Sequence, residues 1–249
     1  MEEIDVKVVI YVAHGSKKEP TNQQFVKAIK SMIEINNAAR KKIAFLEANP
    51  ALDQTIDQCK QEGATQVIVV PIFLLPGMHV TRDIPNILQQ KNRQYPSLSF
   101  YYAPAFNKAK EIVEDTYNRI KNTQALRTGY QQQAVLVISH GSKNTQASHI
   151  FQDFCKALAH KLANIPVYQA YLKSTTPTIE EQIKKLQEQN DATIIVVPHF
   201  FAMTMFPKII ENKIIDMTSK QLVFVKGIAF NNTMKQLMGK QIELAKKID

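Results

Sequence analysis

The sequence contains only two cysteines, and it has no apolar run long enough to cross a membrane. Cys59 and Cys155 fall in helix-like patterns of different parts of the chain, which favours buried, unreactive thiols over a disulfide or a cluster ligand. Lysine and glutamine interrupt every hydrophobic segment, and the acidic stretch Met1–Asp5 leads directly into a strand-like run. We therefore expect no membrane partner, no signal peptide and a cytoplasmic protein.

Arginine-rich blocks and basic patches interleaved with aromatic residues are also absent, although the formal net charge is +9. The lysines lie mostly on predicted helix faces, and no nucleic-acid recognition module is visible, so we expect no nucleic-acid partner. Two interpretations of the charge remain. It is either an ordinary solvated surface or a basic field that attracts a small polyanion.

The main feature that the sequence does contain is an internal repeat, in which one unit occurs twice. Val8–Lys17 (VVIYVAHGSK) returns as Ala134–Lys143 (AVLVISHGSK), and Val67–Pro71 (VIVVP) returns as Ile194–Pro198 (IIVVP). Matching landmarks in the same order, about 125 residues apart, indicate an internal duplication. The two copies differ at a potential functional position, where the first has His79 and the second has Phe206.

The duplication predicts two domains, residues 1–123 and 133–249, joined by a polar linker at 124–132. In each domain, short apolar β-branched runs alternate with longer amphipathic segments, a pattern typical of a parallel sheet covered on both faces. The expected fold is α/β, with two similar domains that each contain a four-stranded parallel sheet flanked by helices. Strands are expected near 6–13, 41–47, 66–72, 97–104, 133–139, 166–172, 193–199 and 221–227. Helices are expected near 21–38, 51–62, 80–93, 107–122, 145–163, 178–189, 206–219 and 231–247.

Three candidate functional residues follow strands of the first domain. His14 ends the first strand, Glu47 ends the second, and His79 lies in the loop after the third, where Gly77 is expected to let the backbone turn tightly. Ligands bind at the carboxyl ends of the strands in open parallel sheets, so these side chains should converge. Two imidazoles and a carboxylate suit Fe²⁺, Co²⁺, Ni²⁺ or Zn²⁺. The alternative for His14 is a local capping role.

The second domain lacks this combination. His140 matches His14, but Lys173 stands where Glu47 would be and Phe206 where His79 would be. His199 is expected in the core or at an interface, and His149 and His160 on the surface of a helix.

Two further features near the candidate site permit more than one interpretation. The loop Gly15–Lys18 opens a helix with backbone amides, a hydroxyl and two ammonium groups, which is a weak anion-binding signal. Arg82 could face a carboxylate of a ligand, or it could pair near Asp83.

The motifs together resemble those of the class II chelatases, and more narrowly the sirohydrochlorin chelatases of sirohaem or cobalamin synthesis. They are Ala13-His14-Gly15-Ser16, Phe45-Leu46-Glu47 and PIFLLPGMHVTRDIP at Pro71–Pro85. The similarity spans the chain and is closest to the fused, double-length form. It implies two α/β halves that face each other across a cleft for the tetrapyrrole, so that a monomer can build the whole cleft.

The resemblance also implies roles for residues. His14 and His79 would be the catalytic residues, and Glu47 would complete the metal contact. Substrate contacts are expected from Ser16, Lys17, Gly77, Met78, Arg82 and His140. The polyanionic substrate would be sirohydrochlorin, with a divalent metal as second substrate and no tightly bound cofactor.

The absence of a histidine-rich tail favours Fe²⁺, while Co²⁺ and Ni²⁺ remain open. A non-catalytic metal or tetrapyrrole carrier is the alternative to an enzyme.

Overall fold

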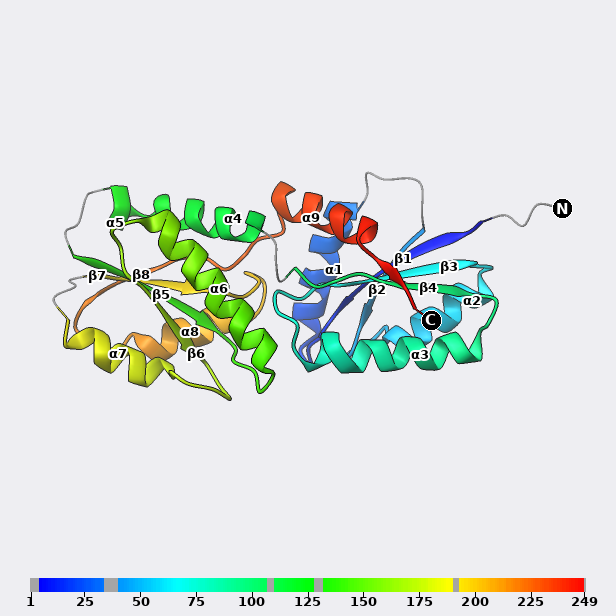
Figure 1. The fold of residues 1–249 in the computed structure, drawn as a ribbon, viewed down its shortest axis with the longest axis horizontal. Coiled ribbons are helices and arrows are strands. Elements are labelled where there is room, and N and C mark those ends of the chain that lie inside the picture. The colour runs from blue at the N-terminus through cyan, green and yellow to red at the C-terminus, as the bar shows by residue number, and fades with distance from the viewer. Residues whose placement is uncertain (1–4, 34–39, 107–109, 128–131, 190–192, 249) are drawn as a thin grey trace. The chain divides into compact units, whose positions relative to one another are not determined.

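The computed structural model describes residues 5–33, 40–106, 110–127, 132–189 and 193–248. The chain divides into two compact units, of which unit 1 comprises residues 1–107 and 230–249 and unit 2 comprises residues 108–229. Each unit is an α/β structure with helices on both faces of a sheet (Figure 1). The α/β fold with two similar domains, expected from the sequence, is confirmed.

Unit 1 is built on a sheet with strand order β2-β1-β3-β4-β9, in which the first four strands are parallel. Its elements are β1 (Lys7–Ala13), α1 (Glu19–Ile33), β2 (Arg40–Phe45), α2 (Leu52–Gln61), β3 (Gln66–Pro71), the π-helical turn η1 (His79–Asp83), α3 (Ile84–Gln94), β4 (Ser99–Tyr102), α9 (Asn232–Glu243) and β9 (Lys246–Lys247).

Unit 2 is built on a parallel sheet with strand order β6-β5-β7-β8. Its elements are α4 (Lys110–Lys121), α5 (Gln124–Arg127), β5 (Gln133–Ser139), α6 (Thr145–Leu162), β6 (Val167–Tyr171), α7 (Ile179–Gln187), β7 (Thr193–Pro198), α8 (Phe206–Ile214) and β8 (Gln221–Phe224).

The central strands are apolar because both of their faces are covered. In β1, Val8, Ile10 and Val12 belong to one core cluster, together with residues of α2 and α3. The alternate residues Val9 and Tyr11 are buried as well, on the opposite face of the sheet. A continuous apolar run is the expected signature of such a strand.

The last helices of the two repeats exchange places. Helix α4 follows β4 in the chain but packs on α6, so it belongs to unit 2, whereas α9 packs on α1 and β3 of unit 1. The compact units therefore differ from the halves 1–123 and 133–249 expected from the repeat. The repeat pattern records the order of elements in the chain, and it carries no signal for which sheet a helix covers.

The sheet of unit 1 also has a fifth strand where the sequence predicted four. Helix α9 ends at Glu243, and β9 then pairs antiparallel with β4 through Tyr101 and Lys247. The helix predicted from the sequence extends to residue 247, four residues beyond this end. The predicted linker 124–132 was also too long, because its first four residues form α5, while residues 128–131 lie outside the described residues.

None of the helices within the described ranges is both long and apolar enough to cross a membrane.

Candidate metal centre

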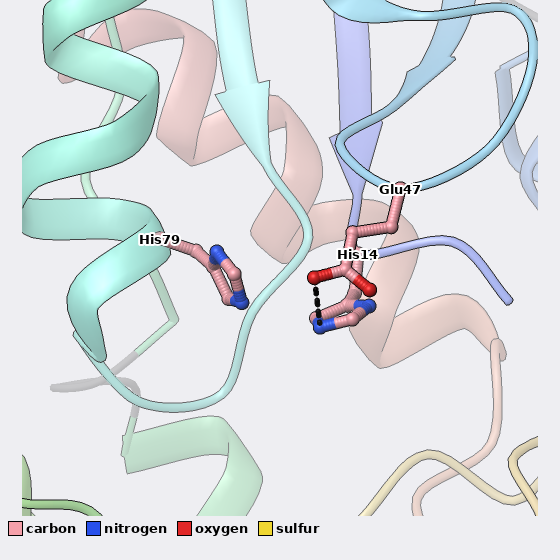
Figure 2. A group of neighbouring side chains, drawn as sticks. All are labelled: His14, Glu47 and His79. Carbon is pink, nitrogen blue, oxygen red and sulfur yellow. Dashed lines mark ion pairs between the residues drawn. The ribbon is translucent and has the colours of Figure 1, made fainter.

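His14, Glu47 and His79 come together at the carboxyl edge of the unit 1 sheet (Figure 2). His14 directly follows β1, Glu47 lies two residues after β2, and His79 opens η1 after β3. The pairing of β1 with β2 continues past both strand ends, since the backbone N–H of Glu47 donates to the carbonyl of His14 at 2.8 Å. This hydrogen bond fixes the spacing between the two residues.

The turn after His14 depends on a glycine. Gly15 has φ +86°, and a Cβ at this position would lie 2.9 Å from the Cβ of Ala48. Only glycine adopts this conformation without strain. The backbone also turns tightly at Gly77, where the N–H donates to the carbonyl of Leu75 at 2.9 Å, but this turn does not need a glycine, because φ is not positive and a Cβ there would meet nothing within 4 Å.

The three side chains are close enough to bind one ion. One ligand atom from each of them lies within 4.8 Å of the others. The Nε2 of His14 is 3.6 Å from the Oε1 of Glu47, and the imidazole rings of His14 and His79 meet edge to face with centroids 4.6 Å apart. The side chains of His14 and Glu47 are 48% and 53% exposed, so the group opens to solvent and to a ligand. Two imidazoles and one carboxylate form a ligand set for a borderline divalent metal.

The ring of His79 is held from its other side. Its Nδ1 is 2.8 Å from the Oδ2 of Asp83, and the Nε of Arg82 donates to the Oδ1 of the same carboxylate at 2.8 Å. The hydrogen bond from Arg82, followed by the one from His79, lowers the pKa of Asp83 below its usual value. Asp83 is therefore ionised near neutral pH.

The π-helical turn that carries His79 has an anchor of its own. The backbone N–H of Ile84 donates to the carbonyl of His79, five residues back, and the hydroxyl of Tyr102 donates to the carbonyl of Val80 at 2.8 Å. Burial raises the pKa of Tyr102, so this hydroxyl keeps its proton and remains a donor.

The loop that begins with Gly15 is less open to an anion than the sequence suggested. The backbone N–H of Ser16 donates to the Oδ1 of Asn22, and that of Lys18 donates to the hydroxyl of Ser16. These two amides are therefore not available to a ligand, which corrects the expectation for this loop. The side chain of Lys17 is exposed.

Unit 2 has a matching place with different residues. The backbone N–H of Lys173 donates to the carbonyl of His140 at 2.9 Å, as Glu47 does to His14. Phe206 lies against His140 with ring centroids 5.1 Å apart. Within the described residues, His14, Glu47 and His79 form the one group with metal-ligand spacing, and His140 is not part of it.

The remaining histidines and the cysteines are where the sequence predicted. His199 is buried against Phe154, and burial, with a smaller contribution from Arg119, lowers its pKa to about 3. His149 and His160 are exposed on α6. Both cysteines are free and buried, and burial raises the pKa of Cys59 to about 11 and that of Cys155 to about 12. Neither is a reactive thiolate.

Asp83 and Tyr102 belong to the site but were not predicted from the sequence. The signal for Asp83 was its spacing of four residues from His79, which puts two side chains on the same side of a helical turn. Tyr102 had no comparable signal, because its contact with the site depends on the pairing of β4 with β3.

The fold and this group of residues define an α/β protein of two similar units, one of which carries a candidate divalent-metal site. The chain belongs to the CbiX family, whose model matches residues 8–123 and 134–247.

Named relatives resemble the chain over nearly its whole length. The sirohydrochlorin ferrochelatase of Priestia megaterium is 24% identical over 97% of this chain and 92% of its own length. The sirohydrochlorin cobaltochelatase of the same organism is 26% identical over 84% of this chain and 69% of its own. The structure of SirB from Bacillus subtilis with Fe³⁺ superposes with a TM-score of 0.82 at 22% identity, over 96% of this chain and 94% of that one. This last likeness establishes a shared fold.

Proposed function

We propose that this protein is a sirohydrochlorin ferrochelatase, which inserts Fe²⁺ into sirohydrochlorin to form sirohaem. The observation that carries the proposal is the exposed group of His14, Glu47 and His79, with one ligand atom from each within 4.8 Å of the others. It occurs in a chain that resembles a sirohydrochlorin ferrochelatase over 97% of its length. A metal that must be passed on to a ring needs an open site of this kind.

The chemistry requires a loosely held metal and a route for two protons. One divalent metal enters the ring and two pyrrole protons leave it, so charge is conserved. In this proposal, the Nε2 atoms of His14 and His79 and a carboxylate oxygen of Glu47 hold the metal. As the metal moves to the ring nitrogens, each freed group can accept a proton and pass it to water.

The substrate contacts are part of the proposal. Met78 is 45% exposed beside His79, where it can lie against the flat apolar ring. Lys17 and Arg82 can meet carboxylates of the polyanion, since a guanidinium has further N–H groups besides the Nε that Asp83 occupies. Ser16, Gly77 and His140 stay predictions as substrate contacts. We further propose that the protein works without a resident cofactor, as a monomer in the cytoplasm.

The test is anaerobic absorption spectroscopy of sirohydrochlorin with substoichiometric protein, run separately with Fe²⁺ and Co²⁺. Metallation faster than the protein-free control, with many turnovers and the higher rate for Fe²⁺, is the expected result. A higher rate with Co²⁺ would overturn the choice of iron. Both metals must be tested because the chain also resembles a sirohydrochlorin cobaltochelatase. A spectral change that saturates at one equivalent of protein would show a carrier instead of an enzyme.

A further inference from the structure

One ring nitrogen of His79 faces Asp83, and the other faces His14 and Glu47. The Oδ1 of Asp83 accepts from the Nε of Arg82, and its Oδ2 lies 2.8 Å from the Nδ1 of His79, a geometry in which Asp83 accepts and Nδ1 carries the proton. In a neutral imidazole, Nε2 is then the nitrogen with a free lone pair. The Nε2 of His79 points toward His14 and Glu47 (Figure 2).

Asp83 is itself held in place. Arg82 occupies its second carboxylate oxygen, and the side chains of Asp83 and His79 are 30% and 33% exposed, so water competes only partly for their hydrogen bond. The four-residue spacing falls on η1, where Tyr102 anchors the carbonyl of Val80. The turn, the carboxylate and the tyrosine together restrict the orientation of one imidazole.

Unit 2 provides an internal comparison, because it has lost the histidine. Counting from the shared strand β3 or β7, Phe206 stands for His79 and Ile210 stands for Asp83. The register of β4 and β8 puts Phe224 in the place of Tyr102, without its hydroxyl.

The backbone of unit 2 changes at the same place. The π-helical turn is replaced there by the regular helix α8, in which the backbone N–H of Ile209 donates to the carbonyl of Met205, four residues back. The carboxylate, the hydroxyl and the π-helical turn are thus absent where the imidazole is absent.

We propose that Asp83 is a positioning residue of the metal site, which fixes the Nδ1–H tautomer of His79 and aims its Nε2 at the ion shared with His14 and Glu47. That the ion is a substrate rests on the proposed function, whereas the tautomer and the metal affinity do not. Carboxylate partners of metal-binding histidines orient the ring and raise its basicity, and their removal costs about 10–100-fold in metal affinity or activity.

The first experiment measures the tautomer without any metal or tetrapyrrole. The ¹⁵N chemical shifts of the imidazole nitrogens of His79, recorded at a pH where the ring is neutral, should show Nδ1–H in the unaltered protein. Asp83→Ala should shift the population toward Nε2–H, and Asp83→Asn should keep Nδ1–H, because its amide oxygen still accepts. Glu62→Ala is the matched control, since Glu62 is an exposed carboxylate that pairs with Lys42, away from the site. Identical spectra for Asp83→Ala and the unaltered protein would overturn the proposal.

The second experiment measures Co²⁺ affinity by the visible absorption of the bound ion. Asp83→Ala should weaken binding about 10–100-fold, and Asp83→Asn less than about tenfold, while Glu62→Ala leaves it unchanged. Loss of binding by Asp83→Ala and Asp83→Asn alike, with an unfolded circular dichroism spectrum, would show a merely structural role. The Co²⁺ affinities can follow the expected order, with the unaltered protein strongest and Asp83→Ala weakest, while the unaltered protein fails to metallate sirohydrochlorin. In that case the proposed function fails and the role of Asp83 stands. If the unaltered protein metallates sirohydrochlorin and Asp83→Ala does so at an unchanged rate, the proposed function stands and the role of Asp83 fails.

Discussion

Phe206 packs against His140 with its ring centroid 5.1 Å away and an interplanar angle of 67°, in the place where His79 meets His14 at 4.6 Å and 88°. The two units thus keep the same edge-to-face pair of rings, but in unit 2 one ring has no nitrogen. A benzene ring can preserve the packing, and it cannot bind a metal or accept a proton.

This relationship predicts unequal effects of removing the histidines. We expect His14→Ala and His79→Ala each to reduce the rate of metal insertion by at least about 100-fold, because each removes one of three ligands. His140→Ala should cost less than about tenfold, since its neighbours Phe206 and Lys173 cannot complete a site. Initial rates of sirohydrochlorin metallation would measure this, and equal losses in all three variants would contradict it.

The same relationship predicts that the missing ligands can be restored. The double variant Phe206→His with Lys173→Glu rebuilds the histidine, histidine and glutamate set around His140. We expect it to bind a second equivalent of Co²⁺, more weakly than the first because Ile210 offers no carboxylate to orient the new imidazole. Titration followed by visible absorption gives the stoichiometry. The single variant Lys173→Glu is the control, and a stoichiometry of one in the double variant would refute the equivalence of the two sites.

A third prediction concerns the turn after His140. Gly141 has φ +89°, and a Cβ there would lie 1.8 Å from the carbonyl oxygen of Lys173. Gly141→Ala should lower the free energy of unfolding by about 2–4 kcal/mol, from left-handed strain together with steric overlap. Gly77→Ala is the control, because its Cβ would meet nothing within 4 Å, and it should change stability by less than about 1 kcal/mol. Urea denaturation followed by circular dichroism would compare them, and equal midpoints would disprove the argument.

The buried His199 predicts a pH dependence of stability. Burial lowers its pKa to about 3 in the folded protein, so between the unfolded value of about 6.5 and pH 3 the unfolded chain binds a proton that the native protein does not. The unfolded state then gains stability as the pH falls, and this one group should remove about 2.5 kcal/mol of folding free energy between pH 7 and pH 4.5. His199→Ile, which introduces the residue type found at the matching position Ile72, should lose that much less on acidification. The exposed His149 supplies the control His149→Ala, and the same acid sensitivity in both variants would contradict the prediction.

Much of the fold could be predicted because its signals are local. The apolar run of β1 and the duplication of the His-Gly-Ser motif identify a strand, a turn and a repeat without any tertiary knowledge. The convergence of His14, Glu47 and His79 also follows from sequence, since each comes after one of three adjacent parallel strands.

The features that sequence could not give depend on long-range pairing. The exchange of α4 and α9 is decided by which sheet each helix covers, and the amphipathic pattern of the helices is the same for either choice. The antiparallel strand β9 is too short for a propensity signal, and its partner Tyr101 lies far from it in the sequence. The tight turn at Gly77 was predictable, but not that it forms without a positive φ, because a glycine beside a functional residue carries no signal for its own φ.

The exchange of the last helices has a consequence for the timing of folding. Unit 2 is continuous in the chain, whereas unit 1 stays open along α1 and β3 until α9 arrives, with the ring of Phe230 against that of Phe25. About 120 residues separate the two parts of unit 1, which at about 5–20 residues per second corresponds to a delay of about 6–25 s during synthesis. Strand β1, which His14 follows, leaves the ribosome before any part of unit 2, yet unit 1 is the later of the two units to close.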